Sequence, residues 1–285
     1  MNTHKIIPPQ TAFEHLELKE FQRLASYISA YSGIKMPPTK KTMLEGRLRR
    51  RLRATGFATF ADYCRFLFDE DGLESEAIFL IDAVTTNKTD FFREPNHFDV
   101  LGNVIVPDLV EGGVADLRIW SAACSTGAEP YTMAMVLEEA VEERKLRSYS
   151  VLATDLSTDV LAAARKGIYP TGMLKPVPGP LRRKYVLESK DPEMDCMRIH
   201  PRLRARVGFA RMNLMDEAYP VEQAVHVIFC RNVLIYFDKP TQAKVLSRLC
   251  DCLTEGGYLT IGHSETISGF GLPLRMISNT VFQRL

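Results

Sequence analysis

The stretch IWSAACSTGAEPYTMAM, residues 119–135, predicts a strand that turns sharply into a helix. A short apolar run ends in small residues, and Pro130 suits the first position of the helix that follows. Turns of this kind commonly hold a dinucleotide, whose pyrophosphate is admitted by a G-x-G-x-x-G pattern. Here there is one glycine, Gly127, and Glu129 stands where the phosphate charge would lie. The stretch therefore predicts a binding turn for a ligand without phosphate.

The chain beyond this turn alternates between strand and helix patterns. Short apolar runs bounded by turn residues, with helical stretches between most of them, occupy 149–155, 206–213, 225–232 and 258–265. Because alternating strands and helices form a parallel sheet covered on both faces, we predict an open α/β sheet. The tail, 272–285, holds two extended pieces with no helix between them. These pieces predict an antiparallel pair at one edge of the sheet.

The first part of the chain shows helical patterns only. Apolar residues at i+4 steps mark one of these helices, at Leu44, Leu48 and Leu52. We therefore predict an all-helical domain over 1–85 and an α/β domain over 86–285.

One segment of the α/β domain interrupts the alternation of strands and helices. Residues 170–206 hold four prolines before Lys184 and are too long for a connector in a compact α/β unit. We predict a small inserted β subdomain there, with a hairpin.

Composition excludes several protein classes. The chain has 285 residues, a net charge of +1 and six cysteines without a C-x-x-C pair. No apolar run approaches the roughly 20 residues that cross a bilayer, and the N-terminus has no secretory core. The histidines show no metal-ligand spacing. We therefore expect a cytoplasmic protein without membrane insertion, disulfides, bound metal or a general affinity for nucleic acid.

Two carboxylates at consecutive strand ends suggest the ligand. Glu129 would repel a pyrophosphate but attract an ammonium or a sulfonium, and Asp155 is placed to accept ribose hydroxyls. S-adenosylmethionine combines adenosine, ammonium and sulfonium without phosphate. As alternatives, Glu129 complements the dipole of its helix, and Asp155 caps the helix that follows it.

Four motifs in this order resemble one known family, the CheR chemotaxis receptor methyltransferases. They are TNKTDFFRE (86–94), WSAACSTGAEPYT (120–132), IFCRNVLIYFDK (228–239) and GHSE (262–265). The resemblance covers nearly the whole chain. It implies a Rossmann-like S-adenosylmethionine-dependent methyltransferase domain with a mixed seven-stranded sheet, preceded by an all-helical domain and carrying a small antiparallel β insertion. It further implies methylation of glutamate side chains on the cytoplasmic helices of chemoreceptors, with S-adenosylhomocysteine as the second product.

The resemblance also assigns residues to the site. The residues that match cofactor contacts of the family are Asn87, Thr89, Arg93, Glu129, Asp155, Asn213, Leu214, Cys230, Arg231 and Asn232. Arg93 and Tyr236 match residues near the transferred methyl group. There are two departures. Ala128 replaces the first glutamate of the family's S-T-G-E-E-P. The segment between Leu187 and Met197 lacks the glycines of members that dock onto a receptor's C-terminal pentapeptide.

The chemistry of the implied reaction asks for positioning more than for proton transfer. A glutamate carboxylate is ionised at neutral pH, so no strong base is needed. Arg93 carries a planar fork that matches a carboxylate, and Tyr236 can donate a hydrogen bond to its second oxygen. As alternatives, Arg93 forms an ion pair with Glu94 or Asp90, and Tyr236 packs in the core.

The run RLRRRLR, 47–53, predicts a basic helix face. Its arginines cannot share the buried side of the helix with the leucines, so we expect them to wrap its exposed side: Arg47, Arg49, Arg50, Arg51 and Arg53. The run suits a solvated face or nucleic-acid binding. The resemblance favours docking of the acidic receptor helices through Arg47, Arg50, Arg51 and Arg53, with the protein acting as a monomer.

Three other functions compete with this one. A nucleic-acid methyltransferase often carries an N-P-P-Y-like run where this chain has CRNVLIY, 230–236. A non-catalytic module that binds S-adenosylmethionine would not need Arg93 and Tyr236. A nicotinamide dehydrogenase conflicts with Glu129 and the single glycine. The GHSE motif does not predict a catalytic triad, because neighbours on a strand point to opposite faces.

Overall fold

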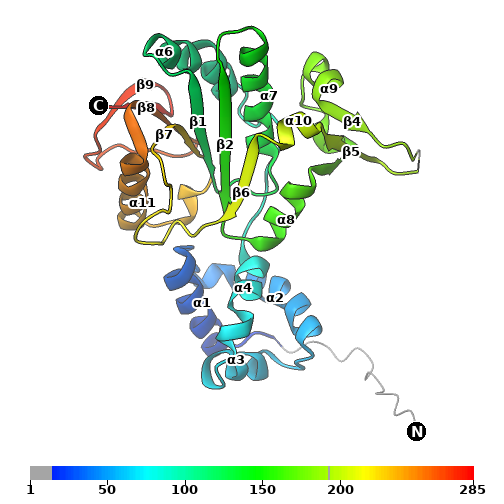
Figure 1. Ribbon diagram of the computed structural model, residues 1–285. Helices are drawn as coiled ribbons and strands as arrows, with labels where there is room; N and C mark the ends of the chain where they lie inside the picture. The colour runs from blue at the N-terminus through cyan, green and yellow to red at the C-terminus, as the bar shows by residue number, and fades with distance from the viewer. Residues whose placement is uncertain (1–14, 192) are drawn as a thin grey trace. The chain divides into compact units, whose positions relative to one another are not determined.

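The computed structural model describes residues 15–191 and 193–285, and the chain divides into two compact units at Thr85/Thr86. Figure 1 shows both units. Within the described residues, no helix combines the length and apolarity needed to span a membrane.

The first unit is built from helices. Phe21, Leu24 and Ile28 form the buried face of α1, and Gly33 ends this helix with a left-handed backbone. In α2 the buried face includes the three leucines at i+4 steps, and Gly56 ends the helix in the same way. The helices are α1 (Leu18–Ser32), the 3₁₀ helix η1 (Pro38–Lys40), α2 (Lys41–Thr55), α3 (Phe60–Asp69) and α4 (Leu73–Val84).

The second unit carries a seven-stranded mixed sheet in the order β6-β2-β1-β7-β8-β10-β9. The first five strands of this order are parallel, and β10 pairs antiparallel with both β8 and β9. The strands are β1 (Asp116–Ala122), β2 (Ser148–Asp155), β6 (Val207–Arg211), β7 (Val225–Cys230), β8 (Leu253–Ile261), β9 (Leu274–Ser278) and β10 (Val281–Arg284). The predicted mixed sheet, with its antiparallel tail at one edge, is confirmed.

Helices connect these strands and precede them. The segment before β1 forms α5 (Asn96–Val100), the π-helix η2 (Leu101–Ile105) and α6 (Val106–Glu111). The connections are α7 (Ala128–Glu142), α8 (Thr158–Lys166), α10 (Pro201–Arg204), the 3₁₀ helix η4 (Leu234–Tyr236) and α11 (Lys239–Cys252). Helix α11 ends at Cys252, because β8 begins at once.

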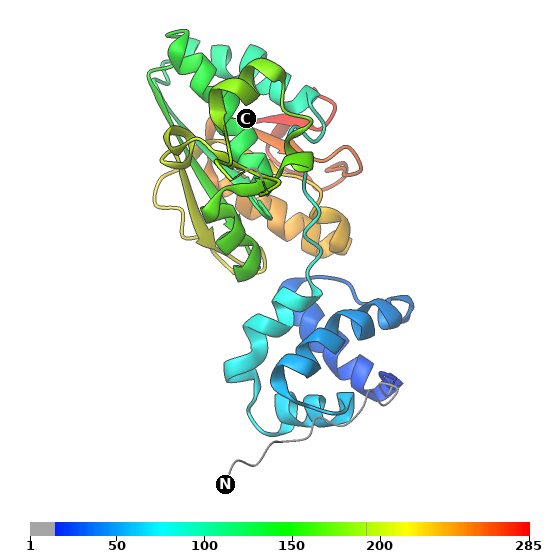
Figure 2. The same ribbon diagram turned by 90° about the vertical axis from the view of Figure 1, so that its right-hand side faces the viewer.

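The insertion forms a second sheet. It is three-stranded and antiparallel, in the order β3-β5-β4, and β4 and β5 form the hairpin. Figure 1 shows it set apart from the large sheet, and in Figure 2 it lies on the side that faces the viewer. Its elements are β3 (Ile168–Pro170), the 3₁₀ helix η3 (Thr171–Leu174), α9 (Gly179–Tyr185), β4 (Val186–Glu188) and β5 (Cys196–Ile199).

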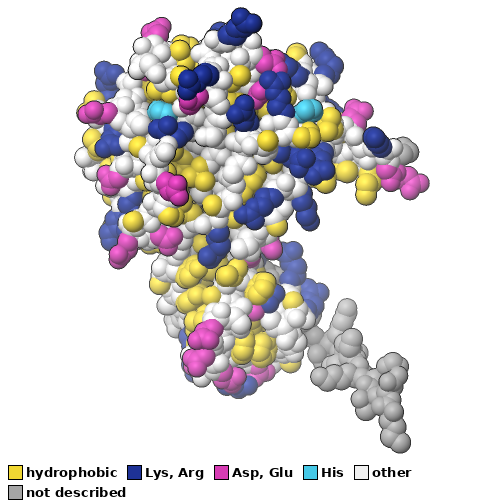
Figure 3. Space-filling model, viewed as in Figure 1, with side chains coloured by type: hydrophobic (Ala, Val, Ile, Leu, Met, Phe, Trp, Pro, Cys, Tyr) yellow, Lys and Arg dark blue, Asp and Glu magenta, His cyan; other side chains and the backbone are white. Residues whose placement is uncertain are grey.

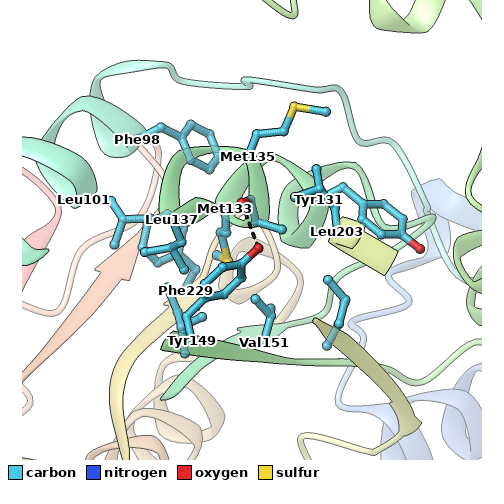
Figure 4. Packing of buried hydrophobic residues seen from close by; sticks show 14 of the residues in the cluster. Phe98, Leu101, Tyr131, Met133, Met135, Leu137, Tyr149, Val151, Leu203 and Phe229 are labelled. Carbon is cyan, nitrogen blue, oxygen red and sulfur yellow. Dashed lines mark hydrogen bonds between the residues drawn. The ribbon is translucent and has the colours of Figure 1, made fainter. Parts of the chain in front are cut away.

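The core of the α/β unit lies between α7 and the sheet, as Figure 4 shows. Met133 and Leu137 of α7 pack in one cluster with Val151 of β2 and Phe229 of β7, and all four are buried. Nearby, Trp120 of β1 is fully buried, and its indole N–H donates to Thr154 Oγ1 at 2.9 Å. This packing fixes β1, β2 and β7 side by side, so their carboxyl ends form one rigid edge.

Candidate functional site

The turn after β1 is held by unusual backbone geometry. Ala123, Ser125 and Gly127 all have positive φ, at 61°, 52° and 88°. A Cβ on Gly127 would lie 2.9 Å from the Cβ of Ala164, so both conformation and space require glycine there. Helix α7 begins at Ala128, with Gly127 as its N-cap.

This start corrects the predicted one. Pro130 is the third helical residue rather than the first, because the left-handed Gly127 begins the helix two residues earlier. Glu129 still lies in the first turn of α7.

Asp155 joins two strand ends. Its carboxylate is buried at the end of β2 and accepts the N–H of Ser125 at 2.8 Å and that of Ser157 at 2.9 Å. Ser157 is the N-cap residue of α8, and no side chain caps that helix. Asp155 therefore binds the N-cap residue without being the cap, and it also holds the turn after β1.

Glu129 is neutralised by an arginine from another strand end. Its Oε1 accepts the hydroxyl hydrogen of Ser121 at 2.7 Å, and its Oε2 lies 2.9 Å from Nη1 of Arg231. The Arg231 side chain is 1% exposed and also pairs with Glu94 at 2.9 Å. Glu129 therefore shares its charge with Arg231, which lies between Glu129 and Glu94.

Arg93 lies in the segment before α5, and its neighbours are held firmly. Phe91 is fully buried against the edge of Tyr169, and the N–H of Phe92 donates to Thr132 Oγ1 at 3.2 Å. Arg93 is half-buried as a whole residue, and its guanidinium donates to the carbonyl of Lys88 at 3.1 Å. Within the described residues Arg93 makes no ion pair, since Glu94 pairs with Arg231 instead.

The side chains of the loop after β7 differ in burial. The side chains of Cys230 and Arg231 are buried, so only their backbone can face a ligand at this edge. Asn232 has a left-handed backbone (φ 58°) and donates from its amide to Glu94 Oε1 at 3.1 Å. Tyr236 ends η4 and is half-buried, so it is not a core residue.

Glu265 holds that loop in place. Its carboxylate accepts the N–H groups of Asn232 at 3.0 Å, Leu234 at 2.8 Å and Gly262 at 2.6 Å. Burial raises the pKa of Glu265, and these backbone hydrogen bonds act in the opposite direction. Glu265 was not among the predicted site residues, and its position in GHSE was the only signal for it in the sequence.

The remaining predicted residues lie on segments that meet the same edge. The carbonyl of Asn87 accepts the hydroxyl hydrogen of Ser125 at 2.9 Å. After β6, Leu214 is buried, and Asn213 Oδ1 accepts the N–H of Met215 at 3.0 Å. Thr89 is half-buried in the segment of Arg93. One network of hydrogen bonds thus joins segment 86–94 to the ends of β1, β2 and β7.

Two histidines meet Glu94 of this network. Among the residues that the structure describes, ligand atoms of Glu94, His97 and His263 lie within 4.8 Å of one another. Burial, with the nearby Arg231, lowers the pKa of His97 to about 4. Burial alone would raise the pKa of Glu94, but hydrogen bonds from Asn232 and Arg231 lower it overall. Spacing along the chain does not reveal this group, because His97 and His263 lie on segments far apart in the sequence.

The arginines of α2 divide into a paired group and an exposed group, and Arg49 belongs to the first because it pairs with the buried Glu45. Arg51 pairs with the buried Glu76, and Arg47 donates to the carbonyls of Val84 and Thr85. Arg50 and Arg53 are exposed. The expectation that all the arginines wrap the exposed side is therefore wrong for Arg47, Arg49 and Arg51. Arg47 and Arg51 join α2 to α4 and to the residue that follows it.

Comparison with known proteins gives a consistent result. Residues 87–282 match the family described as CheR methyltransferase, SAM binding domain, and residues 19–85 match CheR methyltransferase, all-alpha domain. The chain is 41% identical over 255 residues to the chemotaxis protein methyltransferase of Borreliella burgdorferi, covering 88% of this chain and 89% of that protein. It is 36% identical to chemotaxis protein methyltransferase 2 of Pseudomonas aeruginosa, covering 94% of each. The chemotaxis protein methyltransferase of Escherichia coli is also 36% identical, with 94% of this chain and 92% of that protein covered.

Proposed function

The chain belongs to the CheR family of S-adenosylmethionine-dependent chemotaxis methyltransferases, and from this premise we propose that it esterifies glutamate side chains of chemoreceptors. The observation that carries the proposed chemistry is the placement of Arg93. Tyr169 and Thr132 contact the preceding Phe91 and Phe92, and Arg231 donates to the carbonyl of Arg93 itself. The Arg93 guanidinium contacts the backbone carbonyl of Lys88. A guanidinium held in this way can receive an incoming carboxylate.

The strand-end network fits S-adenosylmethionine better than a dinucleotide. The turn after β1 contains one glycine where a pyrophosphate cradle needs several, and its Ser125 N–H is directed to Asp155. The buried Asp155 carboxylate is suited to ribose hydroxyls. We propose contacts from the side chains of Asn87, Thr89, Asp155, Asn213, Leu214 and Asn232, and from the backbone of Cys230 and Arg231. Bound there, the cofactor supplies an electrophilic methyl group on a sulfonium.

Glu129 does not act alone at this edge. Its carboxylate shares Arg231 with Glu94, so the three groups together carry one negative charge. This charge is available to a sulfonium or an ammonium at the sheet edge, although neither carboxylate is free. We propose that Glu129 acts on the cofactor through this shared charge and through its hold on Arg231.

The residues of this chain orient the acceptor. The glutamate to be methylated is already ionised, so the site must align it rather than deprotonate it. We propose that Arg93 grips the carboxylate with its planar fork, and that Tyr236 donates a hydrogen bond to one carboxylate oxygen. Both side chains are half-buried, so they can meet an acceptor brought in from solution.

The partner surface belongs to the helical unit. We propose that exposed Arg50 and Arg53 on α2 dock the acidic cytoplasmic helices of a receptor, with the enzyme acting as a cytoplasmic monomer. Figure 3 shows Lys and Arg side chains gathered on the α/β unit as well, over α8 and the small sheet, where Arg165, Lys166 and Arg198 are exposed. Charge of this kind mainly accelerates encounter with an acidic partner.

Labelled methyl transfer tests the proposal and its rivals together. The acceptors are receptor-bearing membranes, nucleic acid and no acceptor, and alkaline release of methanol identifies carboxyl esters. We expect alkali-labile label on receptors alone. Alkali-stable label on nucleic acid would favour a nucleic-acid methyltransferase, and cofactor binding without transfer would favour a non-catalytic module.

A further inference from the structure

Glu94, His97 and His263 come from two distant segments and face one another. Glu94 and His97 stand at the start of α5, and His263 follows β8. The His97 and His263 rings meet edge to face with centroids 4.8 Å apart. His97 is 3% exposed, whereas His263 is exposed, so the group is open to solvent on one side.

The hydrogen bonds of His97 leave one of its two ring nitrogens without a hydrogen-bond partner among the described residues. Nε2 lies 2.7 Å from Thr280 Oγ1, and the Thr280 hydroxyl is directed to the carbonyl of Asn279 at 2.5 Å. Since that hydroxyl hydrogen is used, Nε2 carries the proton and donates to Thr280, which leaves Nδ1 as a lone pair. Nδ1 is buried without a hydrogen-bond partner among the described residues, and Glu94 Oε2 is 3.4 Å away.

The lone pair of His97 Nδ1 and the carboxylate oxygen Glu94 Oε2 face each other, so the two atoms can bind a cation together. The surrounding charge permits one, because Glu94 and Glu129 share a single guanidinium. Glu265 adds a third carboxylate, bonded to backbone N–H groups. Arg231 bonds Glu94 Oε2 at 2.9 Å, so an ion must displace a weaker donor from that oxygen. The N–H of His263, at 3.3 Å, is such a donor.

We propose that Glu94, His97 and His263 bind one divalent metal ion of the zinc type. Two imidazole nitrogens and one carboxylate oxygen suit Zn²⁺ or Co²⁺ and disfavour Ca²⁺ and Mg²⁺, which require mostly oxygen ligands. Metal–ligand distances of about 2.0–2.2 Å in a tetrahedral site place the ligand atoms roughly 3.3–3.6 Å apart. The exposed His263 therefore swings inward, and water occupies the fourth position. The site adjoins Arg93 but needs neither cofactor nor receptor.

The test measures binding of Zn²⁺ against a chromophoric chelator, and the visible absorption of bound Co²⁺, on the full chain. We expect one equivalent to bind. His263→Ala, at an exposed position, should weaken binding at least about tenfold and abolish the tetrahedral Co²⁺ bands, since it removes one of three ligands. Glu94→Gln should weaken it similarly, with circular dichroism to confirm the fold.

His15→Ala is the matched control, because His15 Nδ1 also lies close to a carboxylate oxygen, Glu45 Oε1 at 3.3 Å, without a third ligand among the described residues. This variant should bind like wild type. The proposal is overturned if wild type binds no Zn²⁺ at micromolar concentration, if His263→Ala binds unchanged, or if His15→Ala weakens binding as much as His263→Ala does.

Discussion

The loops after β1 and β7 end neighbouring strands at one edge of the sheet, and they are held in different ways. The loop after β1 depends on left-handed backbone at Ala123, Ser125 and Gly127, with one added hydrogen bond from the Ser125 N–H to Asp155. The loop after β7 takes its shape from Glu265, a side chain some thirty residues further along the chain. A loop held by backbone geometry depends on single positions within it. A loop held by a distant carboxylate can be loosened from outside, which makes the two separable by mutation.

Arg93 gives the largest expected effect, because its guanidinium is the group proposed to align the acceptor carboxylate, and its segment is tied to both loops. Arg93→Ala leaves the two loops intact and removes the group that aims the acceptor. We expect single-turnover methylation to fall by about 10²-fold or more at saturating cofactor and receptor. Arg93→Lys should recover only part of this, since it keeps the charge but loses the fork. A near-normal rate in Arg93→Ala would assign the aiming role to Tyr236 instead.

Glu265 tests the loop after β7 alone. Glu265→Ala leaves the N–H groups of Asn232, Leu234 and Gly262 without their acceptor. We expect a loss of about 2–3 kcal/mol in the free energy of unfolding, and a roughly tenfold loss of turnover because Tyr236 follows in the same loop. Glu265→Gln keeps one acceptor oxygen and should lose less of both. Thr266→Ala, at the exposed next residue, should change neither; a loss of the same size there would refute the role of Glu265.

Gly127 tests the loop after β1. Gly127→Ala places a Cβ at positive φ and 2.9 Å from the Cβ of Ala164, and we expect about 1–3 kcal/mol of lost stability together with weaker cofactor binding. Gly113→Ala is the control, because its φ is similar (90°) and a Cβ added there would meet no described atom within 4 Å. Unfolding curves that coincide for these two variants would show that crowding at Gly127 contributes nothing. In a double variant with Glu265→Ala and Gly127→Ala, the two losses in the free energy of unfolding should add if the loops are independent.

Substitution of Asp155 tests how strongly cofactor binding by the loop after β1 depends on the neighbouring end of β2. Calorimetry with S-adenosylmethionine should show affinity reduced by roughly 1–3 kcal/mol in Asp155→Ala, the range for polar groups left unpaired. Asp155→Asn keeps the size of the side chain and should lose less. Unchanged affinity in both variants would exclude a contact between Asp155 and the cofactor.

Arg50 and Arg53 lie outside both loops and give the smallest effect. Replacing both with alanine should slow methylation of intact receptors by about two- to fivefold and flatten its salt dependence. Cofactor affinity should not change. Arg51→Ala should instead destabilise the helical unit, because it removes the positive charge that pairs with the buried Glu76 carboxylate and leaves only the hydrogen bond from Tyr63. A double variant with weakened cofactor binding and normal methylation per bound cofactor would contradict docking by this helix.

The contrast between the loops also explains what the sequence could reveal. Gly127 and Asp155 were identified because a glycine at a strand–helix turn and an acid at a strand end are local signals. The charge balance of Glu129 was not, because Arg231 lies 102 residues away. The start of α7 was misplaced because proline at the first helical position is a common pattern, whereas here Gly127 takes the N-cap. Distant pairs such as Arg51–Glu76 are likewise invisible to helical periodicity, which reports only the buried face.

Trp120, buried beside Thr154 in the middle of the sheet, is the single tryptophan of the chain. Its fluorescence therefore reports the state of the α/β unit and is silent about the helical unit, whereas far-ultraviolet circular dichroism sees both. Followed together during denaturation, the two signals distinguish a chain that melts as one body from one whose helical unit melts on its own. No label has to be introduced for this experiment, because Trp120 is a natural fluorescent probe of unfolding. It lies one strand from Asp155.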